Sequence, residues 1–391
     1  MREILVLCPQ ERDRRAIGAA RLETHFAVRY AGRDLDGVDE FDPAAFLAEC
    51  ERLPADGVVA TKDQSALLAA ILAERRGLPG PSPHALLACQ HKPTSRELQR
   101  KVAPDATPRA ALLDGGLPFS PPFFVKPVVG RLSQNVMQID DEEDLAALPE
   151  PDGYARRYGA IAALAGAPPE RAQGFLAEEL LHGLEVTLEG YVHRGRVTTI
   201  GVTDSVMYPG TISFERFEYP SRLSDERQAE LAEIAAAVVR AHELDDAFFN
   251  LEFFVPEDGC PGIVELNARL ASQFAPLVLG LHGRSTYDAL FALSAGEDPA
   301  WHSGRPDGVG VSYVVRVFED AHVERVPDAA DDIEILVRPG LRLSEQGVND
   351  AQSYRLAILY GFGETREEAV RRCRERVRSL SFRLERSPVA H

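Results

Sequence analysis

The segment FFNLEFFVPEDGCPGIVELNAR, residues 248–269, has the pattern of two strands joined by a turn. Residues 248–255 and 262–266 are short apolar runs, and Pro, Gly and Asp crowd the linker PEDGCPG between them. We therefore expect the two runs to pair as neighbouring strands. Several polar side chains interrupt these apolar runs, and burying them would be costly unless they had partners.

These polar side chains form the first candidate site. Glu265 and Asn267 are two positions apart, so on a strand they share a face. Glu252 lies on the preceding strand, and pairing through the turn would bring all three together. Two carboxylates and an amide oxygen suit Mg²⁺, and Arg269 on the same face can complement negative charge. The alternative is a solvated strand face with incidental charges; convergence near one turn favours the metal site.

A second candidate site is the lysine in FFVKP, residues 123–127, with the loop that follows it. Lys126 interrupts an apolar strand, which is costly without a partner such as a phosphate. The loop 128–135 contains Gly130, Arg131 and Ser133, which offer backbone N–H groups, a guanidinium and a hydroxyl to the same anion. The alternative is a lysine at a strand end that extends its side chain to water.

The third candidate site is FLAEELLHGLE, residues 175–185. A strand leads into Glu178 and Glu179, and a glycine-containing turn separates them from Glu185. Such a hinge can present backbone N–H and C=O groups to a purine edge, and Glu185 can accept hydrogen bonds from ribose hydroxyls. A plain β-turn with exposed acids is the alternative, and taken alone this motif favours it.

Along the chain, the lysine with its loop comes first, the hinge second and the hairpin third. In that order the three motifs resemble the ATP-grasp superfamily over roughly residues 91–300. The resemblance implies ATP and Mg²⁺ (or Mn²⁺) as cofactors. The roles it implies are the two nucleotide-binding lysines, Lys92 and Lys126; the mobile phosphate-covering loop, with Ser133; the adenine hinge, Glu178, Glu179 and Leu181; the ribose contact, Glu185; the metal ligands, Glu252, Glu265 and Asn267; and the catalytic arginine, Arg269.

The domain organisation expected from the sequence and the resemblance has three parts. Strands alternating with helices over residues 1–90 indicate an α/β domain with a parallel sheet, similar to the pre-ATP-grasp domain of the family. Residues 91–300 are then the ATP-grasp domain, divided at about residue 180 into a small subdomain and a metal-binding subdomain. Residues 301–391 resemble the small C-terminal α+β domain. The fold class is therefore α/β and α+β.

The resemblance implies an ATP-dependent ligase that joins a carboxylate to an amine through an acylphosphate, releasing ADP and phosphate. Bacterial L-amino-acid (dipeptide) ligases fit better than biotin carboxylases. The carboxylases carry a glycine-rich loop after the second lysine and a glutamate base after the catalytic arginine. This chain has only Gly130 in the loop and no carboxylate among residues 270–273. A carboxylase and a non-catalytic nucleotide-binding module remain the alternatives.

The composition of the chain limits the classes of binding partner that it is expected to have. The 391 residues carry a formal net charge of −18, which argues against general nucleic-acid binding. No apolar run is long enough to cross a membrane. Five scattered cysteines without CxxC spacing indicate reduced thiols and a cytoplasmic location. The small-molecule carboxylate and amine substrates that the resemblance implies are compatible with this composition, and a homodimer is the commonest homo-oligomer.

Lysine is scarce in this chain, so a lysine that is retained is a somewhat better candidate for a functional role. The four lysines are Lys62, Lys92, Lys101 and Lys126, and the other basic residues are arginines. Lys92 and Lys126 fall on the two nucleotide-binding positions of the resemblance. Lys62 and Lys101 have no assigned role, and we expect them to be surface charges.

Overall fold

The computed structural model describes residues 1–36, 38, 40–114, 116–131, 133–149, 153–302, 304 and 306–386. Within these ranges the strands form four β-sheets, of three, four, eight and two strands. Leu132, in the predicted phosphate loop, lies outside the described residues. No described helix has both the length and the apolar character needed to cross a bilayer.

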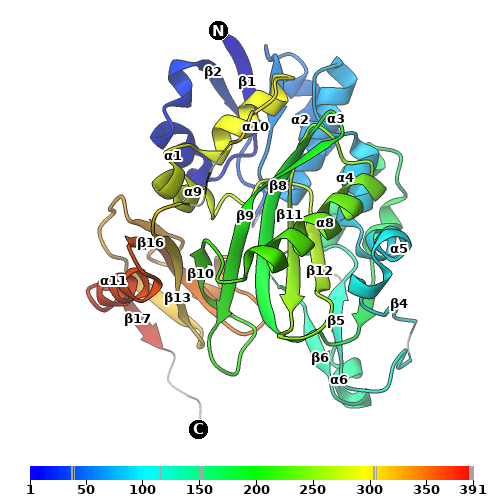
Figure 1. Ribbon diagram of the computed structural model, residues 1–391, viewed down its shortest axis with the longest axis vertical. Coiled ribbons are helices and arrows are strands. Elements are labelled where there is room, and N and C mark those ends of the chain that lie inside the picture. Colours follow the sequence, from blue (N-terminus) through cyan, green and yellow to red (C-terminus); the bar gives the residue numbers. More distant parts are fainter. Residues whose placement is uncertain are drawn as a thin grey trace.

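The N-terminal unit is built on a parallel sheet of order β2-β1-β3. Its elements are β1 (Arg2–Leu7), α1 (Glu11–Ala19), β2 (Phe26–Ala31), α2 (Pro43–Cys50), β3 (Gly57–Val59) and α3 (Asp63–Arg76). The predicted parallel arrangement is confirmed, because β1 pairs in parallel with both neighbours. Figure 1 shows this unit at the top of the molecule.

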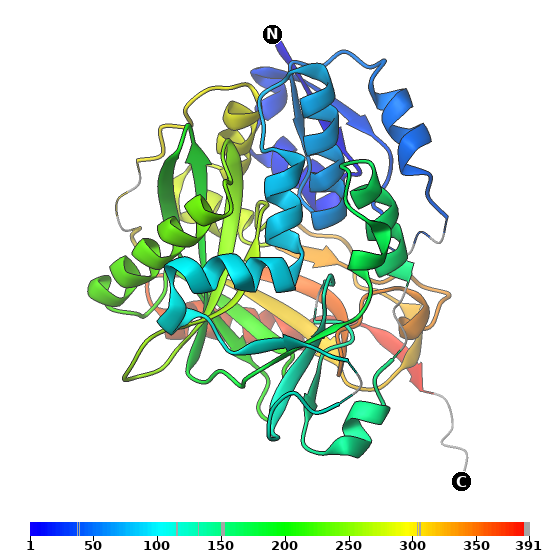
Figure 2. The ribbon, with the colours of Figure 1, turned by 90° about the vertical axis from the view of Figure 1, so that its right-hand side faces the viewer.

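A second unit carries a small antiparallel sheet of order β4-β7-β5-β6. Its strands are β4 (Ala110–Leu112), β5 (Phe123–Pro127), β6 (Met137–Ile139) and β7 (Phe175–Glu178), and its helices include α6 (Glu142–Ala146) and α7 (Gly153–Ala163). Helices α4 (Pro83–Gln90) and α5 (Lys92–Val102) connect this unit to the N-terminal one. In Figure 2 the cyan helix α5 lies between the N-terminal unit above and the small sheet below.

The largest sheet has eight antiparallel strands in the order β12-β11-β8-β9-β10-β13-β16-β15. The strands are β8 (Leu184–His193), β9 (Arg196–Met207), β10 (Phe214–Tyr219), β11 (Ala247–Val255), β12 (Gly262–Asn267), β13 (Val309–Val317), β15 (Ile333–Ile335) and β16 (Tyr354–Gly363). Since β10 pairs with β13, one hydrogen-bonded sheet runs from the β11–β12 hairpin, which carries the predicted metal ligands, into the C-terminal segment. Helix α11 (Arg366–Arg378) and the ribbon of β14 (Ala321–Arg325) with β17 (Arg383–Arg386) complete that segment.

Strand β11 shows how the sequence pattern places the site. Phe249, Leu251 and Phe253 are fully buried and belong to the main core, which also takes residues from helix α8 (Asp225–Ala241). Burying each such side chain contributes roughly 1.5–3 kcal/mol. Because successive strand residues face opposite sides, this packing turns Asn250 and Glu252 to the other face of the sheet.

Two helices that the sequence reading did not identify close the gap between the large sheet and the N-terminal unit. They are α9 (Ala275–His282) and α10 (Thr286–Ser294). Phe291 of α10 packs edge-on against Phe26 of β2, with ring centroids 5.4 Å apart. Gly57 of β3 lies so close to Ser294 that an added Cβ would be 2.5 Å from its carbonyl oxygen. This contact holds the N-terminal sheet against the segment that follows the hairpin of β11 and β12.

Candidate functional site

The predicted hairpin is present, and it brings the proposed metal ligands together. Strands β11 and β12 pair antiparallel with Glu252 opposite Glu265 and Asn250 opposite Asn267. Asn267 donates one amide hydrogen bond to Glu252 Oε1 at 3.1 Å and another to Asn250 Oδ1 at 3.0 Å. Asn250 was not singled out from the sequence, although its spacing of two from Glu252 places it on the same strand face.

The two facing carboxyl groups interact unfavourably in the absence of a cation. Burial raises the pKa of Glu252 to about 7, and the nearby charge of Glu265 adds to that effect. Burial also acts to raise the pKa of Glu265, but Lys92 and Lys126 outweigh it, so that this pKa is lowered. On the neighbouring strand β8, burial and then the charge of Glu252 raise the pKa of Glu185 well above its ordinary value.

This donor set fits a hard divalent cation. A cation between the two carboxylates would relieve their repulsion, and the Asn267 amide supplies a third oxygen. The described residues contain no cluster of three or more His, Cys, Asp or Glu side chains that could hold a metal ion, and at this site only two carboxylates contribute. The set therefore leaves coordination positions for phosphate oxygens and water, which is the usual arrangement for Mg²⁺ at a nucleotide.

Both predicted lysines reach this hairpin from other elements. Lys92, at the start of α5, places Nζ 3.0 Å from Glu265 Oε1. Lys126, on β5, donates to the Val264 carbonyl at 3.0 Å and lies 2.7 Å from Glu178 Oε2. Burial lowers the pKa of Lys126, and the charge of Glu178 opposes that shift. The lysine inside an apolar strand thus has partners on two other strands.

The side chain of Glu178, a residue of the predicted adenine hinge, is buried against two basic residues. It is 5% exposed, and it accepts from Arg96 Nε at 2.6 Å and from Lys126. Burial acts to raise its pKa, but Lys126 and Arg96 outweigh burial and lower the pKa to about 2. Its backbone also lies between two strands, opposite Ala110 and Phe124. The side chain is therefore a buried counter-ion for the site's cations.

The depressed pKa of Glu178 makes a prediction about acid stability. Its folded-state pKa of about 2 is below the ordinary 4.5, so its contribution is present above pH 4.5 and is lost as pH falls through 2. The contribution is about 3 kcal/mol at most. Urea unfolding at several pH values should show wild type more stable than Glu178→Gln at pH 6, with the difference vanishing near pH 2. A difference independent of pH would contradict the ion-pair explanation.

The other hinge residues lie at the edge of the site. Glu179 accepts from the backbone N–H of Arg109 at 2.9 Å and from its Nε at 2.8 Å. Leu181 packs over Gly262 of β12, where an added Cβ would be 2.5 Å from Leu181 Cδ2. Gly183 has a φ of 121° and approaches the Val255 carbonyl closely, which only glycine tolerates. The hinge therefore lies directly over the metal-site hairpin.

Arg269 is bound by two residues of different elements. Its Nε donates to Asp63 Oδ1 at 2.9 Å, and its Nη2 donates to Asn267 Oδ1 at 3.2 Å. Burial acts to lower its pKa, but Asp63 outweighs burial and the pKa is raised. Asp63 is the first residue of α3 in the N-terminal unit. Nothing in the sequence around Asp63 indicated this role, because the contact spans 206 positions.

Glu189 is a further residue that the sequence reading missed. It lies on β8 and is 4% exposed, and its Oε1 accepts from the Ala271 N–H at 2.7 Å. Burial raises its pKa to about 8, while the Ala271 N–H and the charge of Arg269 act in the opposite direction. The sequence has no carboxylate just after Arg269, and the tertiary structure supplies one from another strand.

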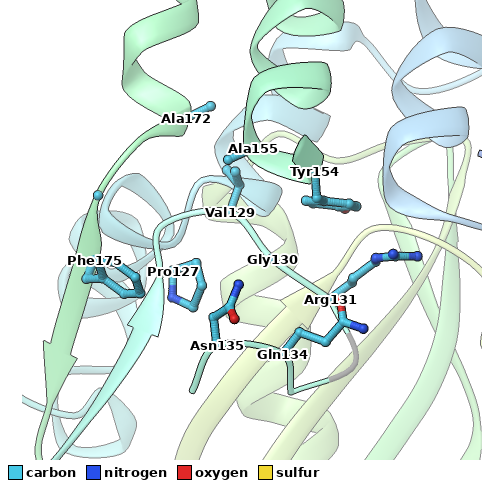
Figure 3. Close-up of a pocket in the computed structure, with 11 residues that line it drawn as sticks. Pro127, Val129, Gly130, Arg131, Gln134, Asn135, Tyr154, Ala155, Ala172 and Phe175 are labelled. Carbon is cyan, nitrogen blue, oxygen red and sulfur yellow. The ribbon is translucent and has the colours of Figure 1, made fainter. Parts of the chain in front are cut away.

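The described residues of the predicted phosphate loop are packed against both neighbouring units. Arg131 forms an ion pair with Asp36, and Gln134 donates to the Asn349 carbonyl at 3.0 Å. Ser133 has a positive φ of 52°. Figure 3 shows Arg131 and Gln134 on the loop, with Tyr154 across from Arg131. The pocket beside them has about 10 Å³, room for roughly one water.

The expectation for the two unassigned lysines is correct for one and wrong for the other. Lys101 is exposed. Lys62 precedes α3 and is only partly exposed, because its Nζ lies 3.0 Å from Asp34 Oδ1 and also contacts Asp36. Burial lowers its pKa to about 8, against the effect of Asp34. Its position next to Asp63 places it beside the site rather than on a remote surface.

Comparisons with known proteins agree with this geometry. Residues 119–276 match the family model of the ATP-grasp domain. The sequence has no significant match among curated proteins. The fold resembles an L-amino acid ligase from Bacillus licheniformis, at 18% identity over 98% of each chain with a TM-score of 0.77.

Two other solved structures resemble the chain over nearly its whole length. One is phosphoribosylglycinamide synthetase from Anaerococcus prevotii, at 14% identity over 98% of this chain and 100% of that one, with a TM-score of 0.69. The other is the biotin carboxylase domain of a Hydrogenobacter thermophilus 2-oxoglutarate carboxylase in complex with MgADP, ADP and bicarbonate. That match has 14% identity over 98% and 91% of the chains, with a TM-score of 0.71. At such identities the likeness establishes the fold, and the predicted fold is confirmed.

Proposed function

We propose that this protein is an ATP-dependent carboxylate–amine ligase, because residues 119–276 match the family model of the ATP-grasp domain and the fold resembles that of an L-amino acid ligase. It joins a carboxylate, of an amino acid or a related acid, to an amine and releases ADP and phosphate. The observation that carries this proposal is one connected cluster. Lys92 forms an ion pair with Glu265 of β12. Lys126 donates to a backbone carbonyl of the same strand, and Arg269 donates to Asn267.

The binding roles in this proposal follow from the cluster. ATP lies between the strand of Lys126 and the hinge around Leu181. Its phosphates replace Glu265 as the partner of Lys92, and they bind Lys126 in addition to Glu178. Glu252, Glu265 and Asn267 would hold Mg²⁺ or Mn²⁺, and the bound cation would offset the charge of the phosphates. Glu178 orients the side chain of Lys126 through their ion pair. The Glu178 carboxylate is itself fixed, because it is buried and also bound by Arg96.

The reaction proceeds in two balanced steps. An oxygen of the substrate carboxylate attacks the γ-phosphorus, and the bond to the β,γ-bridging oxygen breaks, which gives an acylphosphate and ADP. The amine nitrogen then attacks the acyl carbon, loses a proton and displaces inorganic phosphate. Arg269 stabilises the oxyanion of the tetrahedral intermediate. Glu189 is the buried carboxylate beside Arg269 that can take the amine proton.

Glu189 also keeps an ATP-dependent carboxylase as the second candidate function. Activation of bicarbonate needs a base near the arginine, and Glu189 has a raised pKa in that position. The two reactions differ in their co-substrates. ADP release that requires a carboxylic acid plus an amine supports the ligase, and mass detection identifies the amide. ADP release that requires bicarbonate and biotin would overturn the ligase in favour of the carboxylase.

The role of Lys126 makes a prediction about nucleotide use. Replacing it with alanine removes a charged contact to the ATP phosphates, so the KM for ATP should rise roughly 10- to 100-fold. Lys101→Ala removes an exposed lysine and serves as the matched control, with an unchanged KM. Steady-state ADP release at varied ATP measures both. An unchanged KM for ATP in Lys126→Ala would place the nucleotide elsewhere.

A further inference from the structure

Two arginines of the C-terminal segment face each other across neighbouring strands. Arg316 on β13 is the register partner of Arg355 on β16, so their side chains leave the sheet on the same face. Like charges directly opposite each other in a sheet are destabilising. The pair therefore needs compensation from anions, and the two arginines differ in how much they receive.

Arg316 is fully engaged. Its guanidinium contacts Asp350 Oδ2 at 2.5 Å, Ser353 Oγ at 2.8 Å and the Phe214 carbonyl at 2.8 Å. Arg355 makes one side-chain hydrogen bond, a long one of 3.3 Å from Nε to the Val348 carbonyl. Among the described residues, no carboxylate lies within ion-pair distance of Arg355. Its two terminal nitrogens are therefore available to a ligand.

The other charged groups around Arg355 do not neutralise it. Arg12 of α1 lies close by and pairs with Glu334 at 2.8 Å, and Lys62 pairs with Asp34 at 3.0 Å. Arg131 of the phosphate loop pairs with Asp36. Each neighbouring cation has its own carboxylate. Burial lowers the pKa of Arg355 to about 9, and Arg316 and Arg12 act in the same direction. Asp350 opposes them, but this carboxylate is hydrogen-bonded to Arg316 rather than to Arg355. An excess of positive charge is thus concentrated on this one side chain.

This charge lies beside the proposed reaction centre. The electrostatic neighbours of Arg355 include Arg131 on the phosphate loop and Lys62. Lys62 immediately precedes Asp63, which holds Arg269 at 2.9 Å. Arg355 is therefore near the junction of the N-terminal unit, the loop and the C-terminal strands. Its backbone N–H and Nε both donate to the Val348 carbonyl, and the next residue, Asn349, accepts from Gln134 of the loop.

We propose that Arg355 binds an anionic group of the substrate, so that one substrate of the ligase carries a second negative group beyond the carboxylate that reacts. Dicarboxylic and phosphorylated amino acids share this chemistry. The inference rests on the proposed function for the identity of the reacting carboxylate. It goes beyond that function by assigning a charge-selecting residue in the C-terminal segment.

A binding experiment tests the inference without turnover. Calorimetric titrations would use the full chain with Mg²⁺ and a non-hydrolysable ATP analogue, and the matched pairs glutamate and glutamine, aspartate and asparagine, and phosphoserine and serine. We expect at least one anionic member to bind 10-fold or more tightly than its neutral counterpart. The pair that shows the largest ratio distinguishes a carboxylate from a phosphate. Equal or weaker binding of every anionic member would overturn the inference.

Variants then assign the preference to Arg355. Arg355→Gln should abolish the difference within each pair, and Arg355→Lys should keep most of it. Arg371→Gln removes an exposed arginine of α11 and is the matched control. Because Arg355 is a poorly compensated charge, Arg355→Gln should also unfold at a higher temperature than wild type, whereas loss of a structural arginine would lower that temperature. A lower unfolding temperature, or a charge preference that survives in Arg355→Gln, would overturn the inference.

The same variants measured by ADP release separate this inference from the proposed function. Release with neutral acids only leaves the ligase intact and overturns the role of Arg355. No release with any acid and amine, together with charge-selective binding that Arg355→Gln abolishes, supports the anion site and removes the ligase. A raised KM for ATP in Arg355→Gln would assign the arginine to the nucleotide, and so would also overturn the inference.

Discussion

Glu265→Ala should reduce ADP release by at least about 100-fold while the chain still folds, because the variant loses a proposed metal ligand. Glu265 Oε1 also lies 3.0 Å from Lys92 Nζ, so the variant leaves that lysine without its carboxylate partner. The ratio of kcat values at saturating ATP, with Mg²⁺ titrated to high concentration, is the measurement. High Mg²⁺ should recover part of the activity if the remaining ligands, Glu252 and Asn267, still bind the ion weakly.

Glu257→Ala is the matched control for this variant. Glu257 is an exposed glutamate in the turn of the same hairpin, so its loss should leave both activity and Mg²⁺ dependence unchanged. Circular dichroism and thermal unfolding establish that both variants fold. Near-normal activity in Glu265→Ala, with an unchanged Mg²⁺ requirement, would show that the metal site lies elsewhere.

Arg269→Gln should lower kcat by roughly 100- to 1,000-fold, which is the usual cost of losing one charge-stabilising donor at an oxyanion. The KM for ATP should change much less, because Arg269 contacts Asp63 and Asn267 rather than the two lysines. Arg269→Lys keeps a charge but loses the two-directional hydrogen bonding, so we expect only partial recovery. Pre-steady-state ADP release distinguishes acylphosphate formation from the later attack of the amine.

The control for this arginine is Arg240→Gln, which removes an exposed arginine at the end of α8. It should behave as wild type. If Arg269 acts on the oxyanion of the second step, Arg269→Gln should still form ADP in a first turnover while amide formation is slow. Equal loss of both steps would assign Arg269 to the first step instead.

Much of the site follows from local pattern. The hairpin of β11 and β12, the strand around Lys126 and the hinge strand β7 were all expected within a residue or two of where they lie. These elements have strict alternation or short apolar runs bounded by Gly and Pro, which are local signals. Spacing of two along one strand then placed Glu265 and Asn267 on one face before any tertiary information was needed.

Other features were not identified from local pattern. Helices α9 and α10 were not expected, because their apolar residues are spread around the helix. Local start signals were present, since Pro276 lies in the first turn of α9 and Ser285 with Asp288 forms a capping box at α10. The strands β14 and β17 pair only with each other, so neither has the continuous apolar character of a core strand. Glu178 was assigned to the hinge by its position, and its burial between Arg96 and Lys126 could not be read from the chain.

Which residues face one another within a strand or across a short turn could be predicted from the chain alone, since those relations depend only on backbone geometry. Tertiary structure decided which distant charges meet: Lys92 with Glu265, Asp63 with Arg269, and Glu189 with the segment after Arg269. It also decided that Arg355 has no carboxylate partner among the described residues. A buried charge depends on every element that surrounds it, and no local pattern records that environment.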